Sequence, residues 1–222
     1  MVGDIAHVFN RGVEKRNIFL NRKDYLRFVE NLFLLNNKEG KIRTRQGNTL
    51  GHNDLKRKKL VEIFKWSLLP NHYHLLIYEL EEGGILEFTK RLGNAYTKYF
   101  NTKNGKRSGY LFQNSAKIVR MTDDSQFIYA PVYIDINPLD LKFPKWKSSS
   151  INTDKALDFL SNYEWSSFKD FYGSGMHSAV VNKELFYEMF DTNEKKYQKE
   201  LIKFLDNPTV STWQVDTVGN GN

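Results

Sequence analysis

The segment at residues 70–77 (PNHYHLLI) constrains the fold of this chain more than any other stretch. An apolar run after a Pro-Asn turn predicts a buried β-strand, and side chains alternate between the two faces of a strand. His72 and His74 are therefore expected on one face, with Tyr73 and Leu75 on the other. Two neighbouring imidazoles can hold a divalent metal, although the pair also fits two strand histidines that are only hydrogen-bonded.

Hydrophobic periodicity gives the order of elements around this segment. It predicts a strand over 4–10, a helix over 24–35 capped by Asn21, strands over 60–69 and 72–80, a helix over 85–100, a strand over 111–121, and a helix over 124–137 that Pro138 ends. This order matches the split β-α-β pattern. The expected fold class is α+β: a ferredoxin-like antiparallel sheet with helices on one face, plus a mostly helical C-terminal extension.

Changes in composition suggest two parts. Residues 1–144 contain the predicted sheet, interrupted by a polar, basic insertion at 37–59. Residues 145–222 form the extension, with amphipathic stretches near 183–190 and 194–205 and a tail, 215–222, that we expect to be disordered. A serine run at 148–150 is the predicted linker between the two parts.

Basic residues concentrate in two segments. Residues 38–59 hold eight Lys/Arg against two Asp/Glu, and residues 89–120 hold eight Lys/Arg and no acid. Their combined net charge of +14 is twice that of the whole chain, +7. Such a basic face favours a polyanion, with nucleic acid as the first candidate, whereas solvated loops are the alternative. The candidate DNA-binding cations are Arg11, Lys98, Lys103, Lys106, Arg107, Lys117 and Arg120.

Composition also excludes several classes. The chain has no cysteine, so disulfides and thiolate metal ligands are excluded. It has no 18-residue apolar run and no signal-peptide pattern at its start, so we expect a protein that neither crosses nor enters a membrane and that works in the cytoplasm.

A candidate catalytic site forms if the predicted helix 124–137 packs over the histidine pair. Tyr133 and Asn137 are four residues apart and share a helix face. Two imidazoles and an amide oxygen leave open positions on Mg²⁺ or Mn²⁺, where a phosphodiester oxygen could bind. A tyrosine phenolate can attack phosphorus and later leave again, which suits reversible strand transfer. Among the twelve tyrosines, Tyr96 and Tyr99 are rivals, although both also fit core packing.

An ordered set of motifs carries a resemblance to a known family. They are residues 7–12 (HVFNRG), Ile18-Phe19 with Asp24, Tyr25 and Phe28, residues 69–76 (LPNHYHLL), 96–101 (YTKYFN), 109–113 (GYLFQ), 133–138 (YIDINP) and 164–167 (EWSS). The chain resembles the single-tyrosine HUH transposases, in particular the REP-associated tyrosine transposases and their insertion-sequence relatives.

The resemblance implies an enzyme of DNA transposition and recombination. His72, His74 and Asn137 would be the metal ligands for Mg²⁺ or Mn²⁺. Tyr133 would be the catalytic nucleophile that becomes linked to the 5′ phosphate of single-stranded DNA carrying imperfect hairpins. Two features depart from the family: Ser115 stands where a basic residue is usual, and the 37–59 insertion is longer, which suggests a DNA-binding arm.

Other readings remain open at this stage. A non-catalytic or domesticated regulator could bind hairpins on the same scaffold without cutting them, and a nuclease could use water in place of tyrosine. The sequence leaves open a monomer or a homodimer, and whether the helix bearing Tyr133 serves its own sheet or that of a partner.

Overall fold

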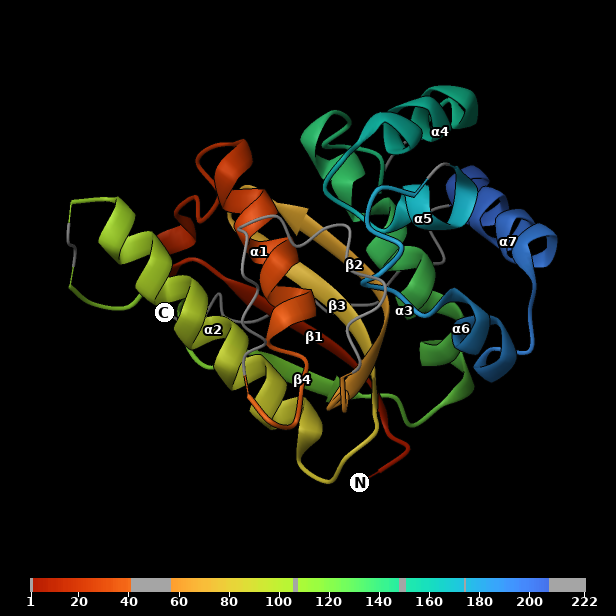
Figure 1. The fold of residues 1–222 in the computed structure, drawn as a ribbon. Helices are drawn as coiled ribbons and strands as arrows, with labels where there is room; N and C mark the ends of the chain where they lie inside the picture. Colours follow the sequence, from red (N-terminus) through yellow and green to blue (C-terminus); the bar gives the residue numbers. More distant parts are fainter. Residues whose placement is uncertain (1, 41–56, 106–107, 148–150, 174, 208–222) are drawn as a thin grey trace.

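The computed structural model describes residues 2–40, 57–105, 108–147, 151–173 and 175–207. Its four strands form one antiparallel sheet in the order β2-β3-β1-β4 (Figure 1). They are β1 (Ile5–Arg11), β2 (Val61–Leu69), β3 (His72–Glu79) and β4 (Lys117–Arg120). The predicted antiparallel pairing of the two strands around the Pro70-Asn71 turn is confirmed. The histidine strand is an inner strand, so both of its edges are hydrogen-bonded.

The predicted strand over 111–121 is much shorter in the structure. Only its last part forms β4, and Phe112 makes an isolated bridge to Gly12. Between them the Asn10 side chain donates a hydrogen bond to the carbonyl of Asn114 at 2.9 Å, where strand pairing would otherwise continue. Residues 111–116 therefore form a loop beside the sheet rather than part of it.

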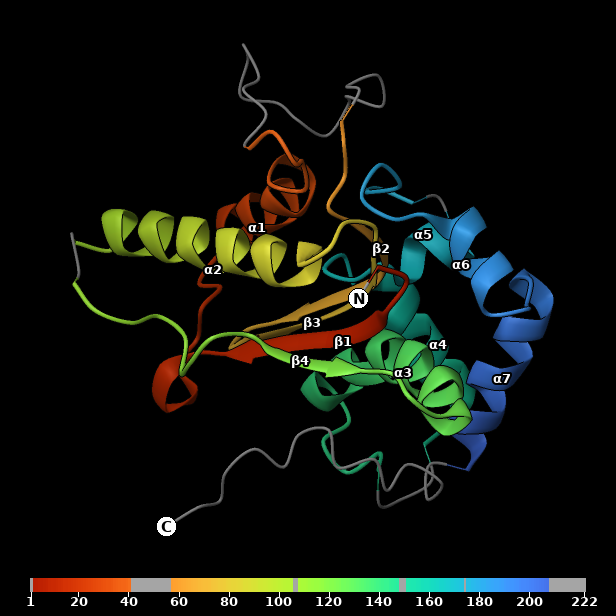
Figure 2. The ribbon, with the colours of Figure 1, turned by 90° about the horizontal axis from the view of Figure 1, so that it is seen from below.

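Two helices cover one face of the sheet, as a ferredoxin-like domain requires. They are α1 (Arg22–Leu34) and α2 (Gly84–Lys103), and Figure 2 shows both on the same side. Asn21 caps α1, as predicted, in a capping box with Asp24. The core beneath them is apolar and includes Val8, Leu75 and Phe88.

The second face is covered as well. Figure 2 shows α3 and the C-terminal helices on the side opposite α1 and α2. The elements here are α3 (Asp124–Ile136), η2 (Asn137–Leu141), α4 (Thr153–Asn162), α5 (Phe168–Tyr172), α6 (Lys183–Met189) and α7 (Glu194–Asp206); a 3₁₀ turn, η1 (Val13–Lys15), follows β1. The predicted α+β class and helical extension are confirmed. Helices lie on both faces because this side also presents apolar residues, among them Phe64 and Leu76, that require burial.

The two edge strands of the sheet, β2 and β4, differ in how their outer edges are covered. Along β2, the backbone N–H of Leu68 donates to Trp165 at 2.8 Å and that of Ser167 donates to Trp66 at 2.9 Å. At the other edge, β4 has only four residues and carries an exposed cation at each end, Lys117 and Arg120.

Most of the basic insertion, the serine run and the C-terminal tail lie outside the described residues. The described part of the insertion is tied to the body, since the Arg57 guanidinium donates to the carbonyls of Phe33 and Ala179. None of the helices in the described ranges combines the length and apolar character that a membrane crossing needs.

Candidate active site on the second face of the sheet

The two histidines of β3 lie side by side on the second face. Their ring centroids are 5.1 Å apart, and the rings are perpendicular. His74 is fully buried and His72 is half-buried. Their neighbours Tyr73 and Leu75 belong to the core under α1 and α2. The alternation predicted from the sequence therefore holds.

A third histidine, which the sequence reasoning missed, supports this pair from β1. His7 Nε2 and His74 Nδ1 are hydrogen-bonded at 2.9 Å, and the two buried rings stack. The only signal in the sequence was its period-two position on the neighbouring strand. Because Nδ1 of His74 is engaged, Nε2 is the nitrogen that can bind a further group. It is buried and has no hydrogen-bond partner among the described residues.

Electrostatics keep His74 neutral. Burial is the main cause that lowers its pKa well below the ordinary value, and the positive charges that His7, His72 and Arg11 can carry lower it further. His72 Nδ1 lies 2.5 Å from the side-chain oxygen of Asn71, which can only accept a hydrogen bond. Nδ1 of His72 therefore donates this hydrogen bond. Neutral imidazoles with a free lone pair are the form that binds metal.

Tyr133 on α3 packs against this histidine cluster from the same chain. Its ring centroid lies 5.6 Å from that of His74 and 6.1 Å from that of His7, edge-on in both cases. The side chain is 7% exposed. Lys147 Nζ lies 5.5 Å from the centre of the tyrosine ring and 3.2 Å from Asp140 Oδ2. The structure therefore brings together the predicted nucleophile and the histidine pair.

Asn137 follows one helical turn later, at the start of η2. It is fully buried, and neither atom of its side-chain amide has a hydrogen-bond partner among the described residues. A buried polar group without a partner is costly and calls for an unseen one. Asn137 follows Tyr133 by four residues, the spacing that places two residues on one side of a helix.

A buried ion pair fixes α3 in this position. Lys65 Nζ on β2 lies 2.8 Å from Asp135 Oδ2, and the Tyr197 hydroxyl of α7 donates to the same oxygen at 2.9 Å. Both charged side chains are completely buried, and the ring centre of Phe171 lies 3.1 Å from Lys65 Nζ. Burial lowers the pKa of Lys65 to about 8 and raises that of Asp135. A lysine in the middle of a mostly apolar strand was the sequence signal for this pair.

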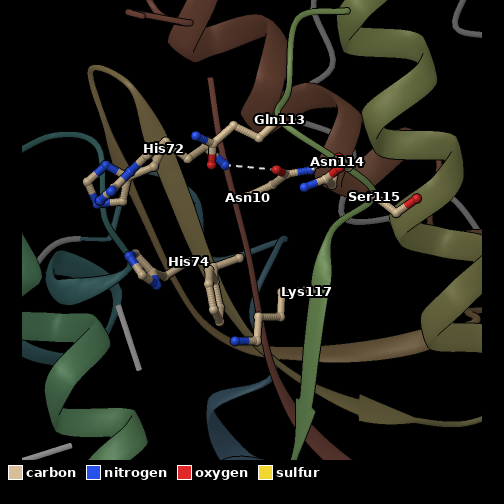
Figure 3. Close-up of a pocket in the computed structure, with 9 residues that line it drawn as sticks. Asn10, His72, His74, Gln113, Asn114, Ser115 and Lys117 are labelled. Carbon is tan, nitrogen blue, oxygen red and sulfur yellow. Dashed lines mark hydrogen bonds between the residues drawn. The ribbon is translucent and has the colours of Figure 1, made fainter. Parts of the chain in front are cut away.

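The histidines open onto a cavity of about 250 Å³, the histidine pocket (Figure 3). Figure 3 shows His72 and His74 on one side and Gln113 and Asn114 on the other. Phe9, Asn10, Arg11, Ser115 and Lys117 complete the lining. Two of the predicted DNA-binding cations, Arg11 and Lys117, thus lie at the histidine pocket.

The other predicted cations lie elsewhere. Lys98 lines a second cavity along α2. Lys103 is paired with Asp24, and Arg120 Nε is 2.7 Å from Asp4 Oδ2. Lys106 and Arg107 lie outside the described residues.

The rival tyrosines are held on the opposite side of the sheet. The Tyr96 hydroxyl donates to the Ile18 carbonyl at 2.7 Å, and the Tyr99 hydroxyl donates to Asp24 at 2.9 Å. Both side chains pack with the core beneath α1 and α2. Neither reaches the histidine cluster on the second face.

The donor set fits a divalent metal of the oxygen- and nitrogen-binding kind. Within the described residues, no group of three or more His, Cys, Asp or Glu side chains is placed to hold an ion. The candidate set is instead two imidazoles and one amide. Nε2 of His74 and the amide of Asn137 are buried without partners, as ligand atoms awaiting an ion would be.

Comparison with known proteins finds similarity among solved structures. No family model matches the sequence, and no curated protein matches it. A solved structure described as a REP-associated tyrosine transposase bound to a REP hairpin is similar, with a TM-score of 0.45 and 14% sequence identity. The match covers 82% of this chain and 87% of that one. The function proposed below rests on the residues of the site itself.

Proposed function

We propose that this protein is a metal-dependent single-stranded DNA endonuclease and strand transferase that acts on hairpin-bearing DNA through a 5′-phosphotyrosine intermediate. The observation that carries the proposal is the packing of Tyr133 edge-on against His74, 5.6 Å between ring centres, within one chain. The resemblance of the ordered motifs to HUH transposases points to the same chemistry.

Tyr133 supplies the nucleophile. Its phenolate oxygen forms a bond to the phosphorus of a DNA phosphodiester while the bond from phosphorus to the 3′ oxygen breaks. The strand then carries a free 3′ hydroxyl, and the 5′ phosphate stays on the protein. Attack by a 3′ hydroxyl reverses the step, because a phenolate is a better leaving group than an aliphatic alkoxide.

His72, His74 and Asn137 would hold the Mg²⁺ or Mn²⁺ ion. When bound, such an ion polarises a phosphoryl oxygen and stabilises the charge that develops during transfer. Arg11 and Lys117 at the histidine pocket attract the DNA backbone. The stacked His7 ring holds His74 in the required orientation.

The test uses an end-labelled DNA hairpin with single-stranded flanks, incubated with the full chain and Mn²⁺ or Mg²⁺. A labelled band that survives denaturing electrophoresis, requires the ion and disappears in Tyr133→Phe supports the proposal. Tyr129→Phe is the matched control, because Tyr129 lies one turn earlier on α3 and packs on Phe204 instead. This control should form the adduct as the wild type does.

Two other outcomes decide against the proposal. Cut DNA without an adduct, unchanged in Tyr133→Phe, would identify a nuclease that uses water. Tight hairpin binding with neither adduct nor cleavage would identify a non-catalytic regulator.

A further inference from the structure

A cavity of about 800 Å³ runs along α2 and is called the α2 groove. Its other wall is the loop at residues 110–116. The α2 groove and the histidine pocket share four lining residues, Asn10, Gln113, Asn114 and Ser115. The two cavities are therefore neighbours that meet at this loop.

The lining of the groove suits an anion that also forms hydrogen bonds. Among the residues that the structure describes, no Asp or Glu lines either cavity, although the chain contains 26 acidic residues. Lys90 and Lys98 lie exposed on the α2 wall. The lining also contains uncharged hydrogen-bond donors and acceptors, including Asn94 on α2 and Gln113 on the facing loop. Single-strand binding sites combine these features with an aromatic platform.

Tyr110 provides such a platform. Its side chain is 86% exposed and lines the α2 groove. It follows Gly109, which has a φ of +106° and so adopts a backbone conformation that favours glycine. A large ring held at the surface beside cations is suited to stack on an unpaired base.

Gly93 is a further feature of the α2 groove. Glycine is a poor helix former, yet Gly93 lies well inside the 20-residue helix α2. An added Cβ at this position would meet nothing within 4 Å, so packing does not require glycine here. Gly93 lines the groove, and its missing side chain leaves that wall open to close approach by a ligand backbone.

We propose that the α2 groove binds the unpaired DNA strand next to the hairpin, as a track that leads into the histidine pocket. Lys90 and Lys98 would contact phosphates, Tyr110 would stack on a base, and the strand backbone would pass over Gly93. This inference rests on the proposed function for the identity of the nucleic acid. It assigns the groove to the single-stranded flank rather than to the hairpin stem.

The experiment measures DNA binding by fluorescence anisotropy in EDTA, so the readout is independent of cleavage. Two oligonucleotides carry the same hairpin, one with single-stranded flanks and one without. Gly93→Leu should weaken binding of the flanked DNA at least tenfold and leave the flankless hairpin unchanged. Its melting temperature should not fall, because leucine is the better helix former. Loss of affinity then cannot reflect loss of folding.

Matched variants separate the groove from general effects. Thr102→Leu changes an exposed residue of α2 outside the groove and should bind both DNAs as the wild type does. Tyr110→Ala should weaken flanked-DNA binding about tenfold, whereas Tyr110→Trp should restore it, as stacking predicts. Lys98→Gln should lower the slope of log affinity against log salt by about 0.7.

Wild-type affinity of Gly93→Leu for flanked DNA would overturn the proposal, as would tighter binding of an RNA flank than of DNA. The failure of each proposal is distinguishable. An adduct at Tyr133 with unaffected groove variants would refute the groove alone. Flank binding that depends on the groove without any adduct would refute the catalytic function alone.

Discussion

The two faces of the sheet differ in the kind of residue they bury. The face under α1 and α2 is built from apolar side chains such as Val8, Leu75 and Ile77. The opposite face buries polar and ionisable groups, including His74 and the Lys65–Asp135 pair. Burial of apolar groups stabilises the fold, whereas burial of charges and imidazoles costs free energy unless they are paired. Both faces bury an apolar cluster that stabilises the fold, and the second face also holds ionisable groups on its strands.

The largest effect should come from breaking the ion pair of the second face. Asp135→Ala leaves the Lys65 ammonium buried without its partner and should lower the free energy of unfolding by about 3–5 kcal/mol. Urea denaturation monitored by circular dichroism measures this. The double variant Lys65→Met with Asp135→Leu should recover most of the loss, since buried pairs are often replaceable by apolar residues. If the double variant is as unstable as the single one, packing around α3 matters more than charge.

The second largest effect on stability is expected for the face under α1 and α2. Leu75→Ala removes a fully buried side chain of β3 next to His74 in sequence and should cost about 3 kcal/mol of stability. Its adduct yield, measured at low temperature on folded protein, should match the wild type because the side chain points away from the site. A folded Leu75→Ala protein without activity would show that the two faces are not separable.

A smaller effect is expected from the third histidine. His7→Ala removes the hydrogen bond to His74 Nδ1 and should weaken Mn²⁺ binding about 10–100-fold. Electron paramagnetic resonance of free Mn²⁺ measures the affinity without any DNA. His7→Gln, whose amide can replace the bond, should recover part of it. Equal Mn²⁺ affinity in the wild type and His7→Ala would mean that His7 only fills space.

The smallest effect concerns Asp170 on α5, also on the second face. Burial raises the pKa of this carboxyl to about 6, above its ordinary value of 3.8. Its protonated form is favoured in the folded state, so this contribution to stability is present below pH 3.8 and is lost as pH rises through 6. Asp170→Asn should therefore gain about 1 kcal/mol over the wild type at pH 7.5 and little at pH 4. Urea titrations at the two pH values test this, and an equal gain at both would contradict it.

Local sequence patterns predicted features of single strands and helices, but not the contacts between distant segments. Alternation placed His72 and His74 on one face, and helical periodicity predicted the helix that carries Tyr133, because both are properties of short segments. Strand register, which brings His7 against His74, depends on residues 67 positions apart. The predicted strand over 111–121 is wrong for residues 111–116 because their pairing with the end of β1 is interrupted at Asn114, where the Asn10 side chain takes the place of a strand partner.

The structure of the two edge strands affects how this protein can associate with other copies of itself. Backbone groups of β2 already bond to the segment around Ser167, and β4 is short and flanked by cations. Exposed strand edges are the usual starting points for aggregation and for dimers built by extending a sheet. Such growth is disfavoured at both ends here. A second copy would have to associate through helices or loops, leaving the two inner strands that carry the histidines undisturbed.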